Sequence, residues 1–200
     1  MKNKIINIAS FLSLLLPTCA SFAESNTIIE LNPLLSINQG LGLNFEYLIL
    51  ESYSLGLDIE TFKQNPYNTD GVNARRDTYT FAPKLHYYPL STEMYGPFLG
   101  LKINFTYEQL SISDFDNSAQ QNLFYIAPAV QTGYRYAFQN GLTFSLYVGF
   151  GYKSKNNEFS QNNIPISKTN NANWQKARSK INENISQIKF DYGLTIGYMF

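Results

Sequence analysis

The sequence has 200 residues, a length typical of a single domain, and its 44% hydrophobic and 15% charged residues exclude a disordered or collagen-like chain. Fifteen Lys and Arg balance fifteen Asp and Glu, so the chain has no net positive charge with which to bind a nucleic acid. Aromatic residues are unusually frequent, because fifteen Phe, fifteen Tyr and one Trp make up 16% of the chain.

Residues 1–23 have the features of a cleaved secretory signal peptide. Two lysines precede an apolar stretch at 5–16, which is too short for a spanning helix of about 20 residues. Small residues stand at the two positions that signal peptidase reads, so the mature chain is expected to begin at Glu24. The only cysteine, Cys19, lies in the removed segment. A lipid anchor on Cys19 is the alternative, and the preceding Thr18 is unfavourable for it.

Eight segments of the mature chain alternate between bulky apolar residues and small or polar ones. The alternation is uninterrupted from Ile188 to Phe200, where every even position is apolar. A period of two predicts β-strands with two different faces, whereas a helix would spread these residues around its axis. The predicted strands cover residues 29–37, 41–49, 55–60, 79–88, 99–108, 124–138, 142–153 and 188–200.

Two kinds of barrel could use this alternation. A water-soluble barrel buries its bulky residues, whereas a membrane barrel turns them towards lipid. The other face combines glycines with ionised groups, which suit the crowded lumen of a narrow barrel better than a solvent-facing sheet. Together with the signal peptide and the terminal Phe200, this favours an all-β fold, an eight-stranded antiparallel transmembrane up-and-down β-barrel formed by residues 24–200.

The spacing of the strands agrees with such a barrel. If both termini lie on one side of the membrane, the turns on that side should be short. Three short connections meet this condition, at residues 50–53, 90–96 and 139–141. The connections on the far side are 39–40, 63–77, 110–122 and 154–187, and three of these four are predicted to be long loops.

The small and polar face carries nearly equal numbers of acidic and basic side chains. We expect them to form a neutral ionic network that fills the lumen. A glycosidase using Glu46 and Glu60 as paired carboxylates would instead need a solvated sugar cleft. The expected network consists of Glu30, Glu46, Asp58, Glu60, Glu108 and Asp191 with Lys84, Lys102, Arg135, Lys153 and Lys189, and it includes the sole histidine, His86.

The region 154–187 contains one helical pattern. Its apolar residues recur at spacings of three and four, beside three basic residues. One hypothesis is a surface helix that contacts lipopolysaccharide phosphates or a host partner. The favoured hypothesis is a solvated loop or an extension of the last strand. The apolar residues are Trp174, Ala177, Ile181, Ile185 and Ile188, and the basic ones are Lys176, Arg178 and Lys180.

Taken together, these features resemble the small outer-membrane β-barrel proteins of Gram-negative bacteria, the OmpX and OmpA-barrel type. The resemblance covers Glu24 to Phe200 and implies an outer-membrane location in contact with lipid and lipopolysaccharide, with no cofactor. The last strand, with Tyr192, Ile196, Tyr198 and Phe200, is similar to the segment that the outer-membrane assembly machinery recognises. No peptidoglycan-binding domain is expected.

Three functions follow from the resemblance. The first is a non-enzymatic structural or surface-interaction barrel that acts through its extracellular loops. The second is a transport barrel resembling OmpW that passes small apolar solutes. The third is a lipid A-modifying enzyme, for which His86 is the only candidate base. The deacylase pattern His-x-Ser is absent, because Tyr87 and Tyr88 follow His86.

Overall fold

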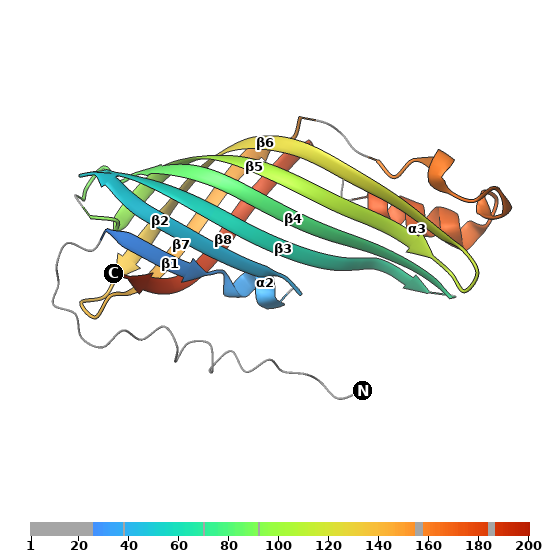
Figure 1. Ribbon diagram of the computed structural model, residues 1–200, viewed down its shortest axis with the longest axis horizontal. Helices are drawn as coiled ribbons and strands as arrows, with labels where there is room; N and C mark the ends of the chain where they lie inside the picture. The colour runs from blue at the N-terminus through green and yellow to red at the C-terminus, as the bar shows by residue number, and fades with distance from the viewer. Residues whose placement is uncertain (1–25, 38, 70, 92, 155–157, 184–186) are drawn as a thin grey trace.

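The computed structural model describes residues 26–37, 39–69, 71–91, 93–154, 158–183 and 187–200 (Figure 1). Eight antiparallel strands pair in chain order, and β8 pairs with β1 to close a barrel. The expected eight-stranded up-and-down barrel is therefore confirmed. The strands are β1 (Thr27–Leu31), β2 (Leu41–Leu50), β3 (Tyr53–Thr69), β4 (Val72–Tyr87), β5 (Gly96–Ser113), β6 (Ser118–Ala137), β7 (Leu142–Tyr152) and β8 (Ile188–Met199).

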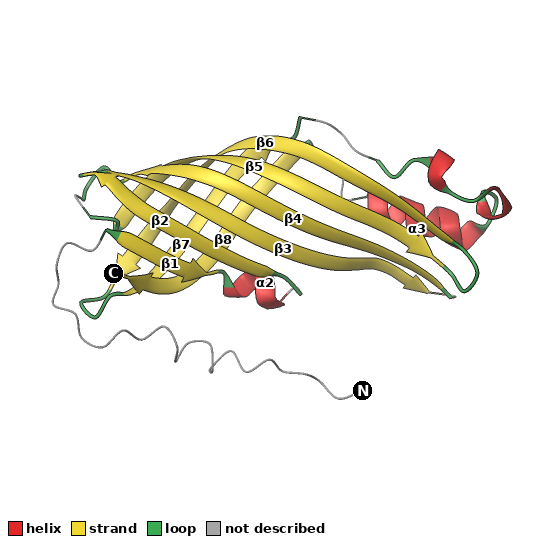
Figure 2. Cartoon of the chain, in the orientation of Figure 1, coloured by secondary structure: helices red, strands yellow, loops and turns green. Residues whose placement is uncertain are grey.

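In the described part of the chain, four short helical segments accompany the strands (Figure 2). They are α2 (Pro33–Ile37), α3 (Ala172–Asn182) and the single 3-10 turns η2 (Gln161–Asn163) and η3 (Ile166–Lys168). Within the described ranges, none of the helices has the length and hydropathy needed to cross a membrane. The expected signal peptide and its cleavage after Ala23 lie outside the described residues and stay a prediction.

The barrel has a polar interior and an apolar exterior. Leu101 and Leu146 point outwards and are 60% and 61% exposed, whereas the inward-pointing Glu46 and Lys102 are 0% and 2% exposed. Burying charge while exposing leucine would be unfavourable in water, but it is the arrangement required when the outer wall contacts lipid. Closure also gives every strand two neighbours, as a sheet in a membrane requires. The face assignment made from the alternation is confirmed.

Strands β3 to β6 extend well past the others at one end of the barrel (Figure 1). They contain 16 to 20 residues, whereas β2, β7 and β8 contain 10 to 12. About 10 residues suffice to cross a membrane as a tilted strand. The predicted long loops at 63–77 and 110–122 are therefore wrong, because most of their residues continue the strands. We call this end the cap end, and the end with Thr27 and Phe200 the terminal end.

The first strand is shorter than the alternation predicted. It ends at Leu31, and residues 33–37 form the helix α2 rather than the rest of a strand. Pro33 has no N–H to donate to a sheet and suits the first turn of a helix. Asn32 accepts a hydrogen bond from the Leu34 N–H at 3.1 Å, which satisfies one free donor of that turn. Of the predicted strand over 29–37, only residues 29–31 are thus in a strand.

Helix α3 covers the inner face of the strand extensions at the cap end. Asn171 caps the helix by accepting hydrogen bonds from the Asn173 and Trp174 N–H groups. Trp174, Ala177 and Ile181 are completely buried. The favoured prediction of a solvated loop or strand extension is wrong for these residues, which form a helix as the three-and-four spacing indicated. They pack in one apolar cluster with Val72, Ala74, Leu110, Ile112, Ala119, Phe159 and Ile164.

A second, smaller apolar cluster closes the terminal end. Met199 packs there with Ile28, Tyr88, Met94 and Phe98, all of which are 7% exposed or less. These residues lie just inside the barrel, where the strands meet the turns. The polar lumen therefore lies between two apolar clusters, one at each end.

Candidate functional site

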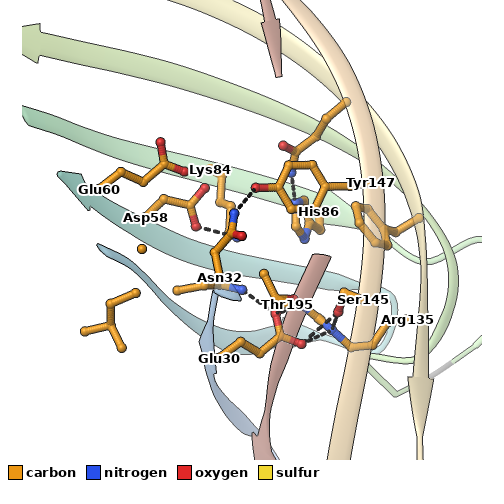
Figure 3. A pocket seen from close by; sticks show the side chains of 15 residues that line it. Glu30, Asn32, Asp58, Glu60, Lys84, His86, Arg135, Ser145, Tyr147 and Thr195 are labelled. Atoms are coloured by element: carbon orange, nitrogen blue, oxygen red, sulfur yellow. Dashed lines mark hydrogen bonds and ion pairs between the residues drawn. The ribbon is translucent and has the colours of Figure 1, made fainter. Parts of the chain in front are cut away.

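The lumen is organised around one arginine from β6. The Arg135 guanidinium donates to Glu30 at 3.1 Å and to the hydroxyl group of Ser145 (Figure 3). It also donates to Glu46 at 2.8 Å and to the hydroxyl group of Tyr88. Arg135 is 1% exposed, and both carboxylates are equally buried. Two carboxylates around one guanidinium leave a net negative charge, which hydrogen bonds from neighbouring strands must stabilise.

Those hydrogen bonds are present around Glu30. Its two carboxylate oxygens accept from four side chains besides Arg135, so that β2, β7 and β8 all contribute. The donors are Asn44 at 2.6 Å, Ser145 at 2.7 Å, Thr195 at 2.8 Å and Thr143 at 3.2 Å. The network joins residues from opposite sides of the barrel and so fixes its cross-section.

Glu46 likewise has several hydrogen-bond partners besides Arg135. It accepts from Ser54 and from Tyr88, and the His86 Nδ1 atom lies 3.1 Å from it. The other ring nitrogen of His86 contacts the Gln131 amide, and the ring stacks on Phe98 with centroids 4.5 Å apart. His86 is thus held on both nitrogens and one ring face, and its position is that of a packed structural residue.

A second layer of charges lies nearer the middle of the barrel. Lys102 reaches Asp58 at 3.0 Å and Asp191 at 2.8 Å, with Glu60 at 3.9 Å. Lys84 pairs with the same Asp58 at 2.8 Å. These contacts place two ammonium groups among three carboxylates. Together the two layers bring nine residues of the expected network into direct ion pairs or hydrogen bonds.

Little space remains among these side chains. The cavity between the two layers, bordered by Glu30, Asp58, Lys84 and Arg135, has a volume of about 20 Å³. A single water molecule needs roughly 10 to 15 Å³ measured in this way. This part of the lumen therefore has room for about one water.

The rest of the expected network lies nearer the cap end and is more loosely arranged. Glu108 accepts a hydrogen bond from Tyr125 at 3.0 Å, and Lys153 lies 5.1 Å from the centre of the same aromatic ring. Lys189 donates to Asn104 at 3.1 Å. Of the residues that the structure describes, none places a carboxylate within 4 Å of Lys153 or Lys189. A cavity of about 310 Å³ separates these groups.

Several lumen residues are absent from the expected network. Tyr88 and Phe98 pack around Arg135, and Tyr125 contacts Glu108. Side chains two residues apart in a strand point to the same face. Phe98 therefore points inwards like Gly100, and Tyr125 points inwards like Ala127. A strict count of the period would have found them, although their aromatic side chains suggest the lipid face.

The predicted surface residues of 172–182 have different environments. Trp174 was predicted as a surface contact, and this is wrong, because it is fully buried and its Nε1 donates to Asp114 at 2.9 Å. Arg178 donates to the Phe159 carbonyl, and Lys180 pairs with Glu183. Lys176 is exposed on the outer side of α3. The structure describes neither Ile185 nor its immediate neighbours, and Ile188 begins β8.

We call the segment 158–183, with η2, η3 and α3, the cap. Asp114 connects this cap to the turn between β5 and β6. It accepts from the Asn117 N–H at 2.8 Å, and its other oxygen pairs with Lys168 at 2.8 Å beside the Trp174 ring nitrogen. The hydrogen bond from Lys168, aided by that from Trp174, lowers the pKa of Asp114 well below its ordinary range. The ionised carboxylate is therefore the form that holds the cap.

We expect the cap to loosen in acid. A lowered folded-state pKa stabilises the cap above the ordinary Asp value of about 3.9, and this stabilisation is lost as the pH falls towards the folded-state pKa. Fluorescence of Trp174, the only tryptophan, should stay constant from neutral pH to about 4 and change below it. Asp114→Asn should alter the signal at neutral pH and flatten the acid response. An unchanged acid transition in that variant would assign the effect to another group.

Across the described residues, no group of three or more His, Cys, Asp or Glu side chains is arranged to hold a metal ion. The lumen is a network of charged pairs and hydrogen bonds. The two carboxylates around Arg135, those of Glu30 and Glu46, already accept hydrogen bonds from several side chains.

Residues 10–199 match a family described as "Protein of unknown function (DUF3575)". No curated protein matches the sequence. Among solved structures, the chain is similar to Acinetobacter baumannii CarO2, with 12% identity, a TM-score of 0.47, and coverage of 88% of this chain and 97% of that one. It is also similar to A. baumannii CarO, with 12% identity, a TM-score of 0.47, and coverage of 91% and 100%. A third similar structure is the N-terminal β-barrel domain of Pseudomonas aeruginosa OprF, with 10% identity, a TM-score of 0.47, and coverage of 88% of this chain and 98% of that one.

Proposed function

We propose that this chain, which belongs to the DUF3575 family, is a non-enzymatic outer-membrane barrel whose sealed lumen supports a cap on the cell surface. The role is structural or interactive, and the cap end is the part that meets partners outside the cell. The observation that carries this proposal is the filled lumen. Arg135, Glu30 and Glu46 cross-link the barrel from inside, and the adjoining cavity of about 20 Å³ leaves no path for a solute.

The outer wall supports the membrane location. Apolar side chains of every long strand point outwards, and aromatic residues gather near the terminal end, where Tyr198 and Phe200 pack with ring centres 5.0 Å apart. Tyr136 and Phe138 form a similar pair at 4.7 Å. Aromatic side chains are favoured at the boundary between lipid and water, so these pairs mark one such boundary.

A planar-bilayer recording tests the sealed lumen. We expect the refolded protein to insert without producing stable conductance steps, because the ionic network blocks the pore. Insertion is checked independently by the mobility shift between boiled and unboiled samples, since a closed barrel resists cold detergent. Reproducible conductance from heat-modifiable protein would contradict the proposal and favour a transport barrel.

Single-cysteine labelling tests the orientation. Cys19 lies in the predicted signal peptide, so the mature chain offers no competing thiol. Lys176→Cys at the cap end should react with a membrane-impermeant maleimide on intact cells. Leu90→Cys, in the turn between β4 and β5 at the terminal end and 81% exposed, should react only after permeabilisation. The opposite pattern would mean that the cap faces the periplasm.

The last strand is proposed to bind the assembly machinery through Tyr192, Ile196, Tyr198 and Phe200. All four point outwards in β8 or follow it, and Phe200 also pairs with Thr27 through its main chain, its N–H donating at 2.8 Å. These side chains are therefore accessible to another protein before the barrel meets lipid.

We expect Phe200→Ala to reduce the amount of inserted protein several-fold, because it removes the aromatic residue that completes the outward face of β8. Phe138→Ala is the matched control, since Phe138 is a terminal-end aromatic of comparable exposure, 44% against 39%. Heat-modifiable protein in outer-membrane fractions is the measurement. Equal losses in both variants would assign the effect to the membrane boundary. Met199→Ala is unsuitable as a mild control, because Met199 is buried in the terminal-end cluster.

The cap supplies the proposed surface contact. Lys176 is exposed, and Lys168 and Lys180 lie on the same segment, although each already pairs with a carboxylate. Phosphate groups of lipopolysaccharide are suitable partners for such a basic surface, because they carry the opposite charge.

A further inference from the structure

The wall of the barrel is incomplete near the cap end, between β8 and β2. The ladder between β1 and β8 has four residue pairs and ends at Leu31↔Ile196. Beyond that point β8 continues along β7 as far as Tyr152↔Ile188, with no further partner in β1. On the other side of the gap, β2 begins at Leu41, where it pairs with Thr61 of β3.

The short helix α2 lies in this gap and contacts both β2 and β8 (Figure 1). It approaches β2 closely because position 42 is a glycine. A Cβ atom there would lie 2.6 Å from the Leu35 side chain. Helix α2 therefore covers the gap by side-chain packing rather than by a continuous hydrogen-bonded strand.

The cavity of about 310 Å³ borders this gap, because residues of both α2 and β8 line it. Its lining includes Phe190 and Tyr192, which have the outward parity of β8 and are 73% and 71% exposed. An outward side chain can border an internal cavity only where the neighbouring strand is missing. Leu34 and Leu35 of α2, with Phe62 of β3, complete an apolar rim. The cavity thus communicates with the lipid-facing surface.

The inner part of the same cavity carries three cations. Arg76, Lys153 and Lys189 border it, and none has a carboxylate within 4 Å among the described residues. Arg76 is 8% exposed, and its Nη2 donates to the Ile181 carbonyl. Its Nε–H has no hydrogen-bond partner in the described structure. A buried guanidinium donor without an acceptor is costly, and an anion in the cavity would satisfy it.

The carboxylates that border the cavity are engaged elsewhere. Asp191 and Glu60 lie 2.8 and 3.9 Å from Lys102, on the side of the central charge layer. Glu108 accepts from Tyr125. The cationic groups therefore remain available to a ligand, although acidic residues lie nearby.

We propose that this cavity binds an amphiphile with one anionic head group, a carboxylate or a phosphate, whose apolar chain leaves through the gap beside α2. The head group meets Arg76, Lys153 and Lys189, and the chain passes along Phe190, Tyr192 and the leucines of α2. A volume of about 310 Å³ lies at the low end of the range for small-molecule pockets, roughly 300–1,000 Å³. It suits a head group and the first part of a chain, while the remainder stays in the membrane.

This inference goes beyond the sealed-barrel function and does not depend on it. Binding from the side requires no passage through the lumen, since the central charge layer still closes the barrel below the cavity.

The test uses the full-length mature protein in phosphatidylcholine nanodiscs, with dansyl-labelled undecanoate as the probe. Empty nanodiscs provide the baseline for partition into lipid. We expect saturable fluorescence enhancement that laurate and dodecyl phosphate displace and that dodecanol does not. Equal displacement by dodecanol would show that the cations contribute nothing. Displacement by inorganic phosphate as effective as that by laurate would reduce the site to a simple anion site. Either result overturns the proposal.

Variants locate the site. Lys153→Gln combined with Lys189→Gln should weaken probe binding by about tenfold or more, as expected for the loss of charge-assisted contacts. Lys176→Gln, on the exposed side of α3, is the charge control and should leave binding unchanged.

Phe190→Ala should weaken binding, whereas Phe150→Ala should not. Phe150 is the direct β7 partner of Phe190 and is 60% exposed to the same lipid phase, but it does not border this cavity. Each variant is first shown to be heat-modifiable, so that loss of binding is distinguished from loss of folding. Equal effects of the two phenylalanine variants, or unchanged binding in the double lysine variant, would contradict the proposed site.

Discussion

Replacement of Arg135 with methionine is expected to lower the free energy of unfolding by about 3–5 kcal/mol, the cost of leaving a buried ion pair without one partner. Glu30 and Glu46 would then remain buried at 0–1% exposure without the guanidinium that contacts both. Urea unfolding of the protein in lipid vesicles, followed by the β-sheet signal in circular dichroism, measures the change. Many molecules of this variant should fail to become heat-modifiable.

Two further variants identify the cause. Arg75→Met removes an arginine whose side chain is 46% exposed and which pairs with Asp77 at 2.8 Å. It should cost no more than about 1 kcal/mol, because exposed pairs contribute little. Combining Arg135→Met with Glu30→Gln and Glu46→Gln removes the unbalanced charges and should recover much of the loss. If the triple variant is as unstable as the single one, packing of the guanidinium rather than its charge is what matters.

Replacement of Leu146 with arginine should destabilise the inserted barrel by about 2–4 kcal/mol, the cost of a lipid-facing Arg near the middle of the bilayer. Leu146 is at the middle of the eleven-residue strand β7 and is 61% exposed. Leu90→Arg is the matched control, because Leu90 is 81% exposed but lies in a turn at the terminal end. The same vesicle-unfolding measurement applies. If both arginines are tolerated equally, the outer wall faces water and the membrane assignment is wrong.

The barrel itself was predictable because lipid imposes a strict rule on every strand. A residue such as Leu146 must be apolar and its neighbour Ser145 must fit the lumen, so the sequence of each strand alternates with a period of two. The identity of the charged lumen residues followed from the same rule. Their pairing did not, since Glu30 and Arg135 are 105 residues apart and meet only through the register of strands between them.

The rule fails where lipid no longer enforces it. Lys63 and Gln64 belong to β3, but beyond the membrane a strand can be polar on both faces, so the period disappears although the hydrogen bonds continue. At Pro33 the reverse occurs, because the alternation continues although the strand has ended. Pro33 keeps the apolar period between Leu31 and Leu35, yet its missing N–H ends the strand. Sequence reasoning therefore missed the strand extensions, α2 and the gap that depends on it.

The polar lumen also limits which amino-acid substitutions this chain can accumulate during evolution. A lipid-facing residue has only to be apolar, so one leucine can become a phenylalanine without a response elsewhere. Glu30 is bound at once by side chains from β2, β6, β7 and β8, and replacing it disturbs four strands together. The outer wall is thus free to drift one residue at a time, whereas the interior must change in concert, and descendants of this chain can keep the inner network long after their outer surfaces have become dissimilar.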